Sequence, residues 1–175
     1  MAETAASADR TSSTPLSRLD SALKALLLGR LTATLGTLDK QGEVSLSMVP
    51  YAIDSHTGDC VLLISGLAAH TQQLHVHARA SLLVTEREDT AENVHALSRV
   101  SLEAEASWPA PGTDSAHQAA AIYLARHPGA EMLTQLPDFR WVRLRPLQAR
   151  HVAGFGAARS LDRPQLLTLI GDISD

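Results

Sequence analysis

Leucines recur three and four residues apart shortly after Thr14 and Pro15, and this spacing predicts an amphipathic helix. A threonine followed by a proline is typical of a helix start, because the hydroxyl accepts a backbone hydrogen bond and proline suits the first helical turn. Gly29 is a suitable end for the same helix. We therefore expect a helix over residues 15–29 whose apolar side packs on the rest of the protein.

From residue 31 onward the pattern changes to short alternating or fully apolar runs, which predict β-strands. Turn residues such as Asp and Gly separate the first three runs, so these runs are expected to form antiparallel hairpins. Six or seven strands with a few helices predict a small, mainly β, antiparallel barrel. The expected strands cover residues 31–38, 43–53, 60–64, 80–85, 100–108 and 139–144, with a seventh suggested at 150–155. Further helices are expected at residues 65–78, 115–127 and 164–170.

The pattern divides the chain into a short polar N-terminal segment and one long segment rich in predicted helices and strands. Residues 1–13 are small and polar and lack the apolar stretch of a secretory signal, so we expect them to form a disordered tail. Residues 14–175 are numerous enough to bury one hydrophobic core and are expected to form one domain. Within that domain the barrel should occupy about residues 30–160.

Composition excludes several classes of protein. Among the 175 residues no apolar run approaches the roughly 20 residues that a membrane helix needs. A net charge of −4 and an aromatic content of 3% argue against a nucleic-acid partner. The single cysteine, Cys60, lies in an apolar run and fits a buried side chain better than a nucleophile. It also suits a reducing compartment, so we expect a cytoplasmic protein with neither membrane nor nucleic-acid partners.

Motifs for several common chemistries are missing from the sequence. There is no glycine-rich dinucleotide or phosphate loop and no nucleophile elbow, so no catalytic residues are assigned. His70, His75 and His77 lie close together in the sequence, but helical neighbours two residues apart point in opposite directions. We therefore predict no metal site.

One segment has the chemistry of an anion site. A strand that ends near Ser65 would lead into a helix whose N-terminus presents free N–H groups. Ser65, His70 and Thr71 could add side-chain donors. The alternative is that Ser65 caps the helix and that the other two side chains face solvent.

Three runs of residues resemble a known family. The runs ATLGTLDKQGEVSLSMVPYAID and LLISGLAAHTQQLHVHARASLLVTE resemble the pyridoxamine 5′-phosphate oxidase-like FMN-binding split barrels. The run from Tyr123 to Arg159, which contains LARHP and GFG, resembles the haem-utilisation branch of that superfamily. The resemblance covers about residues 30–160. It implies a six-stranded split barrel and a homodimer with a ligand site at the subunit interface.

The resemblance also implies where a cofactor would bind. FMN phosphate would lie at the strand-turn-helix segment, with His70 at a position where the oxidases commonly have lysine and Ser47 where they commonly have arginine. Glycines of the GFG turn would approach the ligand closely, and Arg159 could reach a phosphate or carboxylate. The expected cofactor-binding residues are Ser47, Ser65, His70, Thr71, Gly154, Phe155 and Arg159. The main expectation is an FMN-binding flavoprotein, an oxidoreductase acting on an unknown small molecule.

Two alternatives stay open. Haem binding or haem utilisation is supported by Asp138, which matches the Asp-Phe that supports the haem site in that branch. Haem-degrading members ligate iron through a histidine after GFG, and residues 157–175 contain none. Haem is therefore expected to bind weakly and without a defined axial histidine. The third possibility is a non-catalytic carrier or sensor on the same fold.

His151 is expected on a strand surface that faces the dimer seam.

Overall fold

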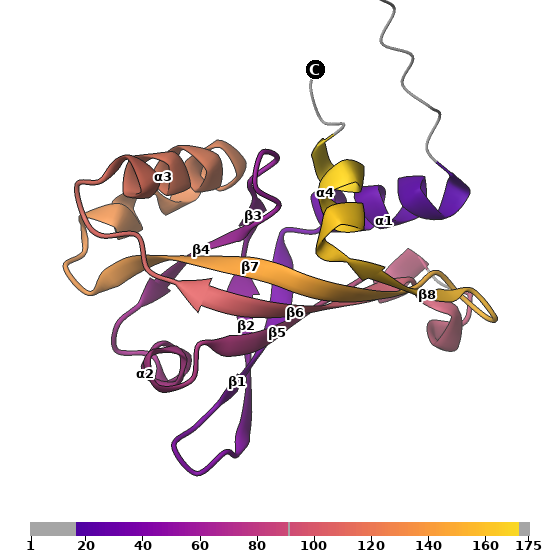
Figure 1. Cartoon of the computed structure of the whole chain (residues 1–175), viewed down its shortest axis with the longest axis horizontal. Helices are drawn as coiled ribbons and strands as arrows, with labels where there is room; N and C mark the ends of the chain where they lie inside the picture. The colour runs from indigo at the N-terminus through magenta and orange to yellow at the C-terminus, as the bar shows by residue number, and fades with distance from the viewer. Residues whose placement is uncertain (1–16, 91, 172–175) are drawn as a thin grey trace, which may run out of the picture.

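A computed structural model describes residues 17–90 and 92–171. They form one antiparallel sheet of eight strands with four α-helices and three short 3₁₀ helices (Figure 1). No helix in these two ranges is long and apolar enough to cross a membrane. The strands are β1 Thr32–Leu38, β2 Val44–Pro50, β3 Ala52–Ile53, β4 Cys60–Ser65, β5 Arg79–Thr85, β6 Arg99–Ser107, β7 Phe139–Val152 and β8 Ala158–Asp162. The helices are α1 Arg18–Gly29, α2 Ala69–Val76, α3 Asp114–Arg126 and α4 Arg163–Gly171, with η1 Glu88–Thr90, η2 Val94–Ala96 and η3 Pro128–Gln135.

The sheet curls so that its two edges meet at a bend at Tyr51. The strand order is β2-β1-β5-β6-β7-β4-β3, so its two ends, β2 and β3, are consecutive in the chain. Because only Tyr51 separates them, the two edges of the curled sheet meet at this bend, and β8 pairs with β7 off the main path of strands. The predicted split-barrel class is confirmed. The expected single strand 43–53 is two strands, since it pairs with β1 before the bend and with β4 after it.

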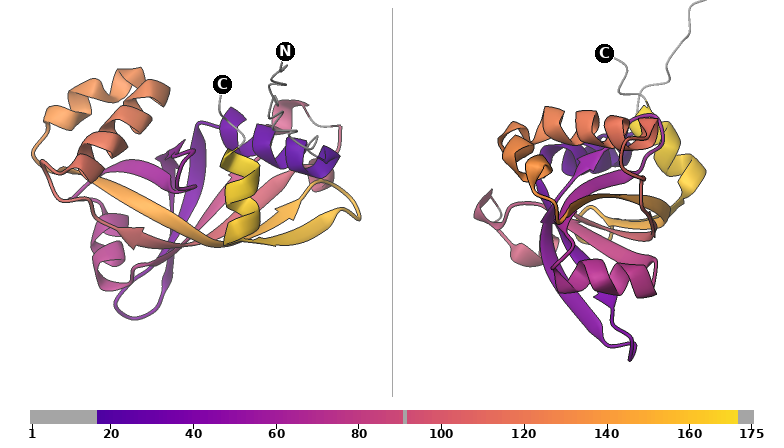
Figure 2. Two further views of the ribbon diagram at one scale, coloured as in Figure 1. Left: turned by 45° about the horizontal axis from the view of Figure 1, so that its top comes forward. Right: turned by 90° about the vertical axis from the view of Figure 1, so that its left-hand side faces the viewer.

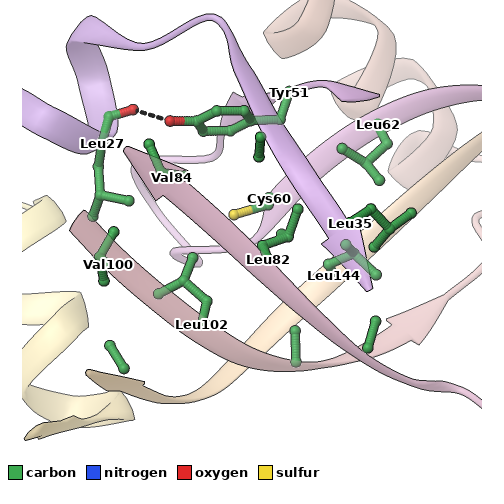
Figure 3. Close-up of a cluster of buried hydrophobic side chains, with 14 of the residues drawn as sticks. Leu27, Leu35, Tyr51, Cys60, Leu62, Leu82, Val84, Val100, Leu102 and Leu144 are labelled. Atoms are coloured by element: carbon green, nitrogen blue, oxygen red, sulfur yellow. Dashed lines mark hydrogen bonds between the residues drawn. The ribbon is translucent and has the colours of Figure 1, made fainter. Parts of the chain in front are cut away.

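Leucine and valine side chains from the inner face of the barrel make the main core (Figure 3). Alternation along β1, β5 and β6 puts every second side chain inside, where each large aliphatic side chain contributes about 1.5–3 kcal/mol. Tyr51 is buried there, and its hydroxyl donates a 2.6 Å hydrogen bond to the Leu27 carbonyl at the end of α1. Cys60 lies in the same core, and burial raises the pKa of its thiol to about 12.

The helices cover different parts of the barrel. The N- and C-terminal helices α1 and α4 lie on the same side of the sheet, and α2 lies across from them (Figures 1 and 2). α3 packs on β3 and β4 through a second apolar cluster that includes Val61, Leu63 and Tyr123. Arg126, in the last turn of α3, donates to the carbonyls of Leu28 and Arg30 and so ties α3 to the end of α1.

The largest departure from the predicted elements is β7. Residues 139–144 and 150–155 were expected as two strands, but one strand runs from Phe139 to Val152. Pro146 is tolerated in it because the β6–β7 register shifts between Glu103 and Ala104, and proline is accommodated at such a bulge. Residues after Val152 form a turn, in which Gly154 and Gly156 have positive φ, and the return strand β8 was not expected.

Helix boundaries also differ from the predicted ones. α2 begins four residues later than the expected helix 65–78, because Ser65 ends β4 and residues 66–68 form a turn. η3 was not expected. The predicted tail and the helix start at Thr14 and Pro15 lie outside the described residues.

Candidate functional site

The expected site residues lie at opposite ends of β7. Ser47, Ser65, His70 and Thr71 gather with Asp138 around the start of β7 and α2, which we call the α2 end. Gly154, Phe155 and Arg159 belong to the β7–β8 hairpin, the hairpin end. A straight strand of 14 residues spans on the order of 45 Å. Figure 1 shows β7 running between the two ends. One protomer therefore does not bring the expected residues into one site.

At the α2 end, Asp138 is fixed from two directions. The Ser65 hydroxyl donates to Asp138 Oδ2 at 2.5 Å, and the Gly66 N–H donates to the Asp138 carbonyl at 2.6 Å. A Cβ atom on Gly66 would lie 3.0 Å from that carbonyl oxygen, so glycine allows the close approach. The turn thus couples the end of β4 to the residue that precedes β7.

The start of α2 differs from both interpretations of the sequence. The N-cap is Ala68, which makes no side-chain cap, so the expected capping by Ser65 is wrong. Ser65 instead accepts from the Leu67 N–H at 3.1 Å, within the turn that delays the helix. Thr71 is buried rather than solvent-facing, and its hydroxyl donates to the Ser65 carbonyl at 2.6 Å. Both hydroxyls are already engaged within the protein.

His70 contacts Ser47, and both residues were expected to bind the phosphate of FMN. Its Nδ1 lies 3.1 Å from the Ser47 hydroxyl, and its Nε2 is buried with no hydrogen-bond partner among the described residues. Burial lowers the pKa of His70, so the imidazole is neutral at neutral pH.

Electrostatics at the α2 end disfavour a phosphate. Residues 65–73 contain neither lysine nor arginine, and Asp138 adds a carboxylate. The nearby Arg140 directs its guanidinium to the carbonyls of Pro137 and Phe139. The neutral His70 supplies no positive charge. A phosphate dianion bound here would lack the charge-assisted hydrogen bonds that usually hold it. These residues therefore do not fit the phosphate of FMN in the way the resemblance implied.

Exposed apolar side chains lie on the same turn and on the segment that precedes Asp138. Leu67 is 86% exposed and Met132 is 82% exposed, and Leu136 of the adjoining segment is also exposed. The backbone bond from Gly66 to Asp138 brings the Leu67 turn next to the segment that carries Leu136. The α2 end is thus a carboxylate within an apolar surface.

The hairpin end, like the α2 end, combines an exposed apolar side chain with a close backbone contact at a glycine. Phe155 lies between two positive-φ glycines and is 72% exposed. A Cβ on Gly154 would lie 3.6 Å from the Ala96 carbonyl, so η2 packs directly on this turn. The exposed Val94 belongs to η2. The contact of this turn with η2 was not visible in the sequence.

Arg159 is already paired with another residue. Its Nη1 lies 2.7 Å from Asp20 Oδ1 on α1, although Nε and Nη2 have no hydrogen-bond partner within 17–90 and 92–171. Arg159 stands directly opposite His151 in the β7–β8 ladder. His151 is 0% exposed, so the expectation that it faces a dimer seam is wrong. Burial and the Arg159 charge both lower the pKa of His151.

A third surface was not expected from the sequence. On β2 the side chains of Val44, Leu46 and Met48 are 70–71% exposed, while Ser45 and Ser47 point toward α2. The serines are held there because Gln73 donates to the Ser45 hydroxyl at 3.0 Å and His70 contacts Ser47. Val44 and Leu46 line a groove of about 380 Å³ together with Gly36. We call Val44, Leu46 and Met48 the β2 stripe.

Comparison with known proteins places this arrangement in a family. The chain is 31% identical over 154 residues to "Heme oxygenase HutZ" of Vibrio cholerae, covering 87% of this chain and 86% of that protein. A solved HutZ structure, described as a haem storage protein, matches with a TM-score of 0.68 and 30% identity, covering 74% of this chain and 91% of that one.

A haem-binding protein from Mycobacterium smegmatis matches with a TM-score of 0.79 and 25% identity over 88% of this chain, and the chain spans 62% of that protein's length. Residues 19–153 match the pyridoxamine 5′-phosphate oxidase family model. The chain therefore belongs to the pyridoxamine 5′-phosphate oxidase-like split-barrel family, and haem-handling proteins are among its relatives.

Proposed function

We propose that this protein binds haem, as a homodimer, between the α2 end of one copy and the hairpin end of the other. The observation that carries the proposal is the chemistry of the α2 end. The Ser65 and Thr71 hydroxyls and His70 Nδ1 are engaged within the protein, and Asp138 adds a carboxylate. The neighbouring cation, Arg140, donates to the carbonyls of Pro137 and Phe139. This replaces FMN, our main expectation from the sequence, with its haem alternative, which the named relatives also favour.

The exposed surfaces suit a flat, mostly apolar macrocycle. Leu67 and Met132 at one end and Phe155 at the other offer apolar contacts without displacing core residues. Porphyrin carboxylates need cations at the rim, and the exposed Arg150 lies two residues before the end of β7, near the hairpin. When bound, haem would supply its own oxygen or redox chemistry, while these residues bind and orient it.

The separation of the two ends supports a dimer. A two-fold axis that placed the α2 end of each copy against the hairpin end of the other would create two equivalent sites. The β2 stripe supplies the exposed apolar surface that such an interface needs, since single exposed apolar residues are common but a contiguous row is not. The dimer and the site are therefore one proposal.

FMN remains the second candidate, because the matched family is named for a pyridoxamine 5′-phosphate oxidase. A flavin without a held phosphate would bind through its ring system alone. FMN and riboflavin should then bind with similar affinity, unlike the strong preference for FMN that a phosphate site would give.

The experiment is a parallel titration of purified protein with hemin, FMN and riboflavin. We expect one hemin per chain, a shifted Soret band, and a dimer mass by light scattering in both free and hemin-bound protein. FMN bound much more tightly than riboflavin, with no stoichiometric hemin complex, would overturn the proposal in favour of the flavin. A carrier with neither ligand would show no saturable change in any of the three titrations, and would overturn it as well.

A further inference from the structure

We infer that His95, on η2 beside the hairpin, is the protein ligand to the haem iron; this rests on the proposed function. A neutral imidazole is a common protein ligand of haem iron, and its ring must be able to present a nitrogen to a group at the surface. The sequence contains eight histidines, and all eight lie within the described ranges. Their surroundings distinguish them.

Three histidines are closed to an incoming metal. His70 Nε2 and His151 Nδ1 are both buried, and their other ring nitrogens face Ser47 and Ser98. His127 Nε2 lies 2.8 Å from the Tyr51 carbonyl, with its ring tilted against Tyr123. The unpartnered nitrogens of His70 and His151 are covered by protein atoms, and His127 would have to leave the Tyr51 carbonyl before it could bind iron.

Four others lie away from the hairpin turn. His75 stacks on Trp108 with ring centroids 4.0 Å apart, and His77 is the C-cap of α2, so both lie at the opposite end of this helix from the Ser65 turn. His117 lies on α3, and His56 lies in the β3–β4 turn within 3.2 Å of the Ser55 hydroxyl. Neither α3 nor the β3–β4 turn carries a residue of the expected ligand site.

His95 combines exposure with a fixed, apolar setting. Its backbone N–H donates to Asn93 Oδ1 at 2.9 Å, and the Leu97 N–H donates to the Val94 carbonyl at 3.3 Å, so η2 is a closed turn. The next residue, Ala96, packs on Gly154 of the hairpin. The imidazole is therefore exposed at a site that is anchored to the GFG turn.

The neighbouring side chains suit a porphyrin rather than a free metal ion. Val94 and Phe155 are exposed apolar groups on the two segments that meet at Gly154. No cluster of three or more His, Cys, Asp or Glu residues that could hold a metal ion occurs in residues 17–90 and 92–171. A single imidazole beside apolar side chains is typical of a site in which the macrocycle supplies the other iron ligands.

The test compares wild-type protein with the variants His95→Ala and His117→Ala, the latter removing an exposed histidine on α3. Each is titrated with hemin, and the ferrous complexes are examined by resonance Raman for the iron–histidine stretch. We expect His95→Ala to lose that band and at least about tenfold in hemin affinity, while far-UV circular dichroism stays unchanged. Added imidazole should restore the wild-type Soret spectrum. His117→Ala should behave like wild type.

The outcomes separate this inference from the proposed function. Stoichiometric hemin binding with an iron–histidine band that persists in His95→Ala would overturn the assignment of His95 and leave haem binding intact. Loss of the iron–histidine band in His117→Ala, with the band kept in His95→Ala, would also overturn the assignment of His95. Wild-type protein that binds no hemin would overturn both. If His95→Ala fails to fold, His95→Gln provides the same readout with a side chain of similar polarity.

Discussion

Ser65 and Asp138 are 73 residues apart in the sequence, yet the serine hydroxyl donates to the aspartate carboxylate at 2.5 Å. The bond joins the end of β4 to the residue before β7, where the two strands pair as Ser65 with Phe139. It uses the serine that the sequence suggested for a phosphate and the aspartate that it suggested for haem. This one hydrogen bond therefore occupies the Ser65 hydroxyl, which could otherwise donate to a phosphate, and orients the Asp138 carboxylate.

Removing this hydroxyl should weaken both stability and haem binding. Ser65→Ala leaves Asp138 Oδ2 without its donor, which should cost about 1.5 kcal/mol because Asp138 is only half-buried. Urea unfolding measures the loss, and hemin titration should show weaker binding. Ser101→Ala, on an exposed position of β6, is the matched control. Equal stability of the two variants would show that the bond contributes nothing measurable.

The buried ion pair between Arg143 and Asp54 should dominate stability at acid pH. Burial opposes ionisation of Asp54, but hydrogen bonds from Arg143 and from the His56 and Thr57 backbone lower its pKa. The lowered pKa stabilises the fold above the unfolded pKa of about 3.9, and this contribution is lost as pH falls through the folded value. Arg143→Met should cost about 3–5 kcal/mol, because it leaves a buried carboxylate unpaired.

The same variant should also unfold at a higher pH than wild type in an acid titration followed by circular dichroism. Asp54→Asn combined with Arg143→Met should recover part of the lost stability, since the amide removes the unpaired charge. A double variant no more stable than Arg143→Met alone would contradict this explanation.

Two buried histidines should make stability depend on pH near neutrality. Burial lowers the pKa of His70, and burial together with Arg159 lowers that of His151. The unfolded chain binds protons at higher pH than the folded one, so stability should fall as pH drops from about 6.5 through the folded values. Urea midpoints between about pH 7.5 and 5 measure this slope. His151→Gln and His70→Gln should each flatten it, and an unchanged slope in both variants would refute the assignment.

The β2 stripe should control assembly. Leu46→Glu puts a charge in the middle of an exposed apolar row, so the dimer should dissociate while the barrel stays folded. Sedimentation at micromolar concentration measures the mass. Gln118→Glu, which adds the same charge to the exposed face of α3, should remain dimeric. Hemin affinity should fall with the dimer, because the proposed site needs both copies. A dimer that survives Leu46→Glu would place the interface elsewhere.

Local sequence patterns determined most of the secondary structure. Alternation identified β1, β5 and β6, since a strand with one buried face repeats every two residues. Glycines at 154 and 156 indicated a turn because only glycine readily adopts positive φ. The proximity of Ser65, His70 and Thr71 also followed from the sequence, since one short segment carries all three.

Tertiary contacts decided which side chains of those elements face inward and how far each strand extends. Alternation on β2 did not say which set of side chains faces inward. Pairing with β1 puts Ser47 beside the buried Leu35 and Ser45 beside the buried Thr37, and there His70 and Gln73 bond to the two serines. The expected strand ended at residue 144, but a bulge between Glu103 and Ala104 lets β7 continue through Pro146. That continuity is what separates the two halves of the expected site. A local pattern carries no information about a bond across 73 residues or about the length of a strand that passes through a bulge, because both are set by the partner strand.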